Sequence, residues 1–110
     1  MTIRNRLPLL LALALLATAP AHAAKGNPEA GKVKSAACVI CHGPNGLSAQ
    51  SGFPILAGQN RDYLVHSLQA YKSGKRKNPV MAGQVASLSN SDIADLAAFF
   101  ALQKGLSLKY

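Results

Sequence analysis

The sequence predicts an all-α fold of three to four helices. Three segments begin with a capping residue and end near a glycine or a cysteine pair, and the second and third of them carry apolar residues on one face. No segment alternates apolar and polar residues over the length that a strand needs, so no sheet of consequence is expected. The 110 residues fit one domain, and 12 basic against 4 acidic residues give a formal net charge of +8.

Residues 1–23 are predicted to be a secretory signal peptide and are left out of the fold. Two arginines precede an apolar run at 7–19, and Ala21-His22-Ala23 fits the small-x-small cleavage rule. That run of about 13 residues is shorter than the roughly 20 that span a bilayer, so a retained membrane anchor is the weaker alternative. Cleavage would leave residues 24–110 as the folded domain, exported to the periplasm and without stable membrane insertion.

The first helix is expected from about residue 28 to residue 37, ending just before Cys38. Asn27 suits the N-cap, a proline suits the first turn, and Glu29 favours the positive end of the helix dipole. Residues 43–52 are rich in Gly, Pro, Asn and Ser, which predicts a loop.

The second helix is expected from Arg61 to Ser73, after an apolar, turn-like segment at 53–58. Asn60 can cap its start, and Gly74 is placed to end it. Its apolar residues recur on one face: Leu64, Val65, Leu68 and Tyr71.

A basic connector at 75–79 leads into residues 80–83, which show no strong period and are expected to be irregular. Ser89 and Asp92 resemble a capping box, so the last helix is expected to start there and to run to about Lys104. Its apolar face is formed by Ile93, Leu96, Ala97 and Phe100, with Phe99 adjacent.

Cys38-Val39-Ile40-Cys41-His42 is the motif that carries chemistry. Cys-x-x-Cys-His is the attachment signature of c-type haem: the thiols add across two vinyl groups, and the histidine becomes the proximal iron ligand. A covalent haem would also supply the staple that so short a chain needs. A zinc site would need two further ligands, and a thioredoxin-like pair would need strands. One covalent haem c per chain is therefore favoured, with disulfide redox chemistry as the main alternative.

The sixth iron position has one main candidate. Met81 is the only methionine besides Met1. From composition alone, a role as an iron ligand and a role as a gap-filling core residue are equally favoured. His66 is the only other histidine in residues 24–110. It lies at the edge of the apolar face of its helix, which favours a surface histidine over a ligand.

The chain resembles the class I cytochromes c, and most closely the periplasmic c-four type, over nearly all of residues 24–110. Besides the haem motif, which continues into Gly43, five segments carry the resemblance: Glu-Ala-Gly-Lys at 29–32, Phe-Pro-x-Leu-Ala-Gly-Gln at 53–59, Tyr-Leu at 63–64, Asn-Pro-Val-Met at 78–81 and Asp-Ile-Ala-Asp-Leu-Ala-Ala-Phe-Phe at 92–100. The c-four proteins usually carry this unit twice in tandem. The single motif here implies a monohaem protein, as in the small c-553 relatives.

The resemblance implies a small class I cytochrome c fold wrapped around one covalent haem. It implies two thioether cysteines, two axial iron ligands, and a proline carbonyl that accepts the proximal imidazole N–H: Cys38, Cys41, His42, Met81 and Pro54. The resemblance also implies that the first and last helices cross closely, with Gly31 on the first helix meeting Leu96 or Phe99 on the last.

With both axial positions filled, no coordination site is open, so the expected function is a periplasmic, low-spin electron carrier cycling between Fe(II) and Fe(III), not an enzyme. The alternative is a haem c subunit of a larger dehydrogenase or oxidase complex. A ligand-binding protein of the cytochrome c-prime kind is disfavoured. The haem motif of that class lies near the C-terminus, whereas here it lies early in residues 24–110.

The expected partners are redox proteins with acidic docking surfaces, such as a terminal oxidase, reductase or dehydrogenase. The basis is a basic cluster formed by Lys72, Lys75, Arg76 and Lys77. The same cluster also fits a solvated connector or the neutralisation of a haem propionate, and the sequence does not choose among these. Export and the lack of aromatics within the basic run argue against nucleic-acid binding.

Overall fold

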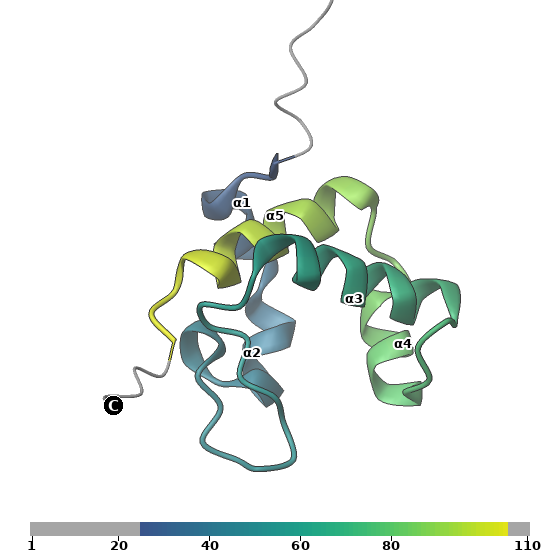
Figure 1. Cartoon of the computed structure of the whole chain (residues 1–110), viewed down its shortest axis with the longest axis horizontal. Coiled ribbons are helices and arrows are strands. Elements are labelled where there is room, and N and C mark those ends of the chain that lie inside the picture. The colour runs from purple at the N-terminus through teal and green to yellow at the C-terminus, as the bar shows by residue number, and fades with distance from the viewer. Residues whose placement is uncertain (1–24, 106–110) are drawn as a thin grey trace, which may run out of the picture.

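A computed structural model describes residues 25–105, and the predicted signal peptide at 1–23 lies outside them. Within residues 25–105 the structure is all-helical, which confirms the predicted fold class (Figure 1). The count is five α-helices instead of three to four: α1 (Pro28–Lys34), α2 (Ala36–His42), α3 (Arg61–Ser73), α4 (Pro79–Val85) and α5 (Asn90–Leu102), with a short 3-10 turn, η2 (Pro44–Gly46).

The first predicted helix is two helices, so its expected end before the cysteines is wrong. The break lies at buried Ser35, whose hydroxyl donates to the carbonyl oxygen of Lys32 at 2.7 Å. The Ser35 N–H is shared between the carbonyls of Gly31 and Lys32, and a second helix starts at once. The cysteine pair therefore lies inside a helix, α2, and not just beyond the end of one.

Residues 80–83 are helical, which corrects the expected irregular segment. Asn78 caps α4 by accepting hydrogen bonds from the N–H groups of Val80 and Met81, at 3.0 and 3.1 Å. Pro79 occupies the first turn, where its missing N–H has no cost. The same Asn-Pro pair starts α1, where Asn27 caps. Because α4 has only seven residues, its apolar period is too short to stand out.

The two long helices match their predictions closely. Asn60 caps α3 by accepting from the N–H of Tyr63, and Gly74 ends it with a left-handed φ of 77°. Ser89 and Asp92 form the predicted capping box of α5. This helix packs against both α1 and α3, and its residues 93–100 are all buried (Figure 1). The core of the molecule therefore lies along α5.

No single helix in residues 25–105 is long and apolar enough to cross a membrane. Only α4 and α5 counted together pass the length and composition test, and they are bent by 111° relative to each other.

Helices α1 and α5 cross closely at Gly31. A Cβ added there would overlap the carbonyl oxygen of Asp95 and lie 2.8 Å from the Cβ of Phe99. Of the two partners that the resemblance suggested, Phe99 is among the nearest neighbours of Gly31, and the backbone at Asp95 lies closer still. A side chain at position 31 would therefore push the two helices apart.

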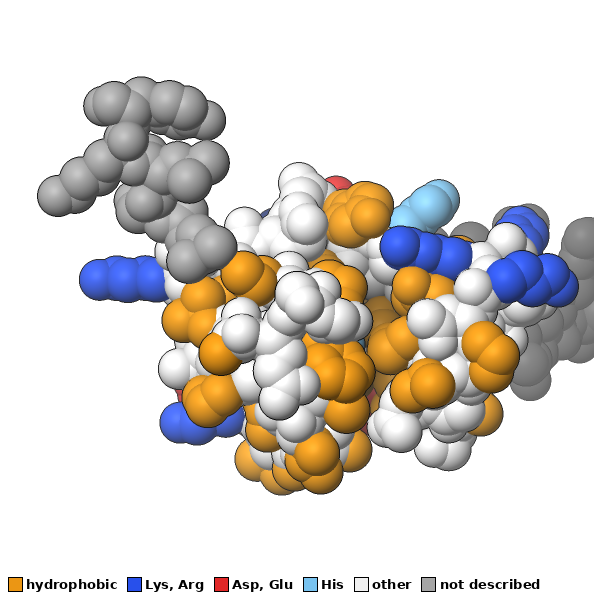
Figure 2. Space-filling view, turned by 90° about the horizontal axis from the view of Figure 1, so that it is seen from below, with side chains coloured by type: hydrophobic (Ala, Val, Ile, Leu, Met, Phe, Trp, Pro, Cys, Tyr) orange, Lys and Arg blue, Asp and Glu red, His pale blue; other side chains and the backbone are white. Residues whose placement is uncertain are grey.

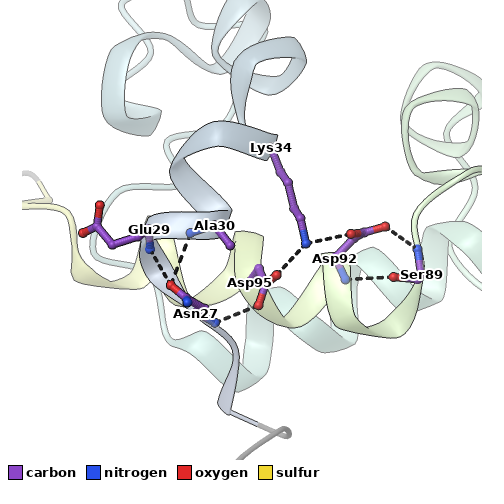
Figure 3. Close-up of polar contacts among 7 residues, drawn as sticks. All are labelled: Asn27, Glu29, Ala30, Lys34, Ser89, Asp92 and Asp95. Carbon is purple, nitrogen blue, oxygen red and sulfur yellow. Dashed lines mark hydrogen bonds and ion pairs between the residues drawn. The ribbon is translucent and has the colours of Figure 1, made fainter.

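Polar contacts join the same two helices (Figure 3). Lys34 pairs with both Asp92 and Asp95, at 2.8 and 2.5 Å, and the backbone N–H of Asn27 donates to Asp95 at 2.7 Å. The hydrogen bond from Lys34 is the largest cause that lowers the pKa of each carboxyl, to about 2 for Asp92. These contacts hold α1 on α5 as long as both carboxylates are ionised.

Acidification is expected to weaken this junction. A carboxyl whose pKa is lowered by folding stabilises the fold above its unfolded value, 3.8, and this contribution is lost as the pH falls towards the folded value of about 2 for Asp92. Thermal unfolding at a series of pH values should therefore show a steeper acid loss for wild type than for Lys34→Met. Lys32→Met removes the same charge from α1 without breaking an ion pair, and should keep the wild-type profile. Equal acid sensitivity of the two variants would contradict the prediction.

Candidate functional site

A cavity of about 410 Å³ lies between α2, the loop at 52–59, α3, α4 and α5. Its size is within the range of about 300–1,000 Å³ that is typical of sites for small organic ligands. Figure 2 shows the molecule from below, with hydrophobic side chains gathered around a hollow beside its α3–α4 end. All five predicted site residues line this cavity: Cys38, Cys41, His42, Pro54 and Met81.

Helix α2 brings three of these residues to the cavity. Cys38 is half-buried against the hydrophobic core, whereas Cys41, almost one helical turn later, is exposed. Both are free thiols, and burial raises the pKa of the Cys38 thiol. His42 is the last residue of the helix and is buried. One short helix therefore presents two thiols and an imidazole to the same space.

The loop opposite α2 fixes the ring of His42. Its Nδ1 lies 2.7 Å from the carbonyl oxygen of Pro54, and since a carbonyl only accepts, Nδ1 carries the proton. Phe53 meets the same ring edge-on, with centroids 6.4 Å apart. The loop is itself anchored, because the N–H of Leu56 donates to the Gly46 carbonyl at 2.9 Å. This arrangement leaves Nε2 of His42 with a free lone pair.

Met81 reaches the cavity from a distant part of the chain, helix α4. Met81 is half-buried on α4, and α4 packs against α3. His66, the other histidine of the described chain, is exposed on α3 and does not line the cavity. The structure thus brings the sulfur of Met81, and not a second imidazole, into the same cavity as His42.

Several cavity residues were not predicted from the sequence. Tyr63, Ser67 and Tyr71 lie four residues apart on α3, so they share one face, and Arg76 from the following connector joins them. The four-residue spacing of the three α3 residues is visible in the sequence and indicates a shared helix face. The sequence alone, however, places Tyr71 among the apolar residues and Arg76 in the basic cluster. Their common position at the cavity depends on how the connector folds back.

Comparison with known proteins decides the family. The family model described as cytochrome c matches residues 28–102, which include the cysteine pair, His42 and Met81. The chain belongs to the cytochrome c family. Cys-x-x-Cys-His is the attachment motif of c-type haem in such proteins, and this cytochrome c has one copy, at 38–42.

Two individual relatives show which members of the family this chain is similar to. This cytochrome c is 46% identical over 100 residues to cytochrome c4 of Pseudomonas aeruginosa, covering 91% of the chain but 49% of the relative. It is 39% identical over 82 residues to cytochrome c-554(548) of Halomonas halodenitrificans, covering 72% of the chain and 99% of the relative. The chain therefore spans about half the length of the cytochrome c4 that it matches.

A solved structure shows the same fold. The crystal structure of reduced recombinant cytochrome c4 from Pseudomonas stutzeri matches with a TM-score of 0.70 at 42% identity, covering 74% of this chain and 47% of that one. The match supports one cytochrome c unit folded as in the longer protein.

The residues of the cavity fit a covalent haem. Two thiols on one face of α2, an imidazole with a free nitrogen and a thioether from α4 face a cavity whose other walls are mostly apolar. A haem is a large apolar ring that needs this kind of lining, with soft or imidazole ligands for iron. The donor set of this cytochrome c is therefore the one that its family's cofactor requires.

Proposed function

We propose that the protein is a periplasmic electron carrier with one covalent, low-spin haem c. One observation carries the proposal: a single cavity is lined by both the Cys-x-x-Cys-His motif of α2 and Met81 of α4. In this assignment Cys38 and Cys41 form the thioether links, and His42 and Met81 are the axial ligands. The bound haem would supply a one-electron Fe(II)/Fe(III) couple.

Pro54 serves as the positioning residue for the proximal ligand. Its carbonyl oxygen, 2.7 Å from Nδ1 of His42, fixes the tautomer and the rotation of the ring. A histidine held in this way is also a more basic ligand, because its N–H is polarised by the acceptor. Phe53 packs edge-on against the ring and limits its movement.

With a protein ligand on each side, no position is left for a substrate, so we infer a carrier and not an enzyme. Thioether sulfur favours Fe(II) more than a second imidazole does, which raises the potential. The predicted signal peptide supports export to the periplasm. The exposed lysines of the α3–α4 connector support partners with acidic surfaces, met in brief and weakly bound encounters.

Replacement of Met81 tests the axial assignment. Met81→Leu keeps the volume but removes the sulfur, so the holoprotein should lose the weak red absorption band of methionine-ligated ferric haem. Its potential should fall by roughly 0.1 V or more, since axial ligands set haem potentials over about 0.8 V. Optical spectra and potentiometry measure both effects.

A matched control removes the other candidate ligand. His66→Ala, on exposed α3, should leave the spectrum and the potential at their wild-type values. Survival of the red band in Met81→Leu, or its loss in His66→Ala, would refute the assignment. Stoichiometric co-purification with a larger dehydrogenase or oxidase would instead favour the subunit alternative.

A further inference from the structure

The four cations of the basic cluster do not face the same surroundings. Arg76 lines the cavity, whereas Lys75 and Lys77 do not. Lys72 donates a hydrogen bond to the carbonyl oxygen of Leu88 and so ties the end of α3 to the segment before α5. All three connector cations are exposed, but only Arg76 lies at the mouth of the cavity.

Arg76 is held in place by contacts with α3. Its backbone N–H donates to the carbonyl oxygen of Ala70 at 3.0 Å, which folds the connector back onto the helix. Its guanidinium carbon lies 4.8 Å from the ring centroid of Tyr71, a cation–π distance. Nη1 lies 3.5 Å from the hydroxyl oxygen of Ser67. The guanidinium is thus fixed at the cavity wall without a carboxylate partner in the described chain.

Tyr63 completes a cluster of donors at this wall. Hydrogen bonding with Ser67 and Arg76 lowers the pKa of the Tyr63 phenol, with the charge of Arg76 as a further cause. The same field that favours a phenolate would favour any other anion placed there. Tyr63, Ser67 and Arg76 all line the cavity, and hydrogen bonding joins the three side chains there.

No other element of the described chain brings charge to the cavity. The lining residues from α4, α5 and the loop at 52–59 include no titratable side chain, and α2 contributes only Cys38, Cys41 and His42. Arg76 is the one Lys or Arg among the lining residues. A ligand that fills the cavity would therefore be apolar over most of its surface and anionic at the wall near Arg76.

We propose that Arg76, Tyr63 and Ser67 form a carboxylate-binding site, and that its ligand is one propionate of the haem. The inference rests on the proposed function, because it needs a haem in the cavity. A guanidinium binds a carboxylate through two parallel N–H donors, which a lysine cannot do, and the two hydroxyls supply further donors. Arg76 then holds this propionate ionised and offsets its charge next to the iron.

The test compares two variants of the haem-loaded protein that lose the same charge from the same connector. Arg76→Gln leaves a propionate without its cation, and the uncompensated negative charge favours Fe(III), so the reduction potential should fall. The propionate pKa should also rise, so the potential should climb as the pH is lowered through that value. Lys75→Gln, which does not touch the cavity, should keep the wild-type potential and its pH profile.

Each outcome separates the inference from the proposed function. Equal shifts in Arg76→Gln and Lys75→Gln, or an unchanged pH profile in Arg76→Gln, would overturn the site. If Arg76→Gln fails to accumulate, Tyr63→Phe and Ser67→Ala decide: both should show a smaller fall in potential with the same pH trend, and wild-type behaviour in both would overturn it. A wild-type protein without covalent haem would refute the proposed function and this inference with it.

Discussion

The double variant Cys38→Ser, Cys41→Ser is expected to lose all covalent haem and most of its helical structure. The cavity between α2 and α4 is large for this chain, and its apolar walls would face water without an occupant. The core that remains is small: the largest fully buried side chains are Ile93, Leu96 and Val85. A small domain has a free energy of unfolding of about 5 kcal/mol. Loss of the covalent haem, which staples this domain, should cost more than that amount. Haem staining after denaturing electrophoresis and circular dichroism measure the two losses.

Ile40→Ser is the matched control for this double variant. Ile40 lies between the two cysteines on α2 and is 81% exposed, so a polar side chain there costs little. It should retain covalent haem, helix content and melting temperature. Cys41→Ser alone should keep one thioether link and an intermediate stability. A double variant that kept wild-type helix content without haem would show that the fold does not depend on the cofactor, contrary to the prediction.

The helices that were predicted well are those whose signals are local. Helix α3 begins and ends where its N-cap Asn60 and terminal Gly74 place it, and α5 begins at its capping box. The break at Ser35 was not predictable in this way, because nothing in that residue forbids a continuous helix. Ser35 is buried where the break occurs, and burial depends on contacts between distant segments, which are not visible in a local pattern.

The site was predictable only in part, for the same reason. The haem motif is compact, so its spacing alone indicates the chemistry. Pro54 and Met81 were implied by a family resemblance and not by local pattern, since each comes from a separate segment. Arg76 was seen only as a member of a basic run. Its position beside the cavity goes with the hydrogen bond from its own N–H to the carbonyl of Ala70, which folds the connector back and is not visible in a local pattern.

Gly31→Ala is expected to destabilise the holoprotein by about 3 kcal/mol or more, although alanine favours helices by about 1 kcal/mol over glycine. The new methyl group would overlap the backbone carbonyl of Asp95 and lie 2.8 Å from the Cβ of Phe99, and both belong to the buried stretch of α5. Neither can rotate away, so α1 must move. That movement would also break the contacts that Lys34 and Asn27 make with Asp95.

Gly83→Ala provides the control, because Gly83 also lies inside a helix, α4, but nothing is within 4 Å of its added Cβ. There the higher helix propensity of alanine acts alone, so stability should stay unchanged or rise by up to about 1 kcal/mol. Urea unfolding of both variants, followed by circular dichroism, compares a crowded glycine with an open one in the same protein. Equal stabilities would mean that the crossing of α1 and α5 tolerates a methyl group, and that close packing at Gly31 does not hold the first helix in place.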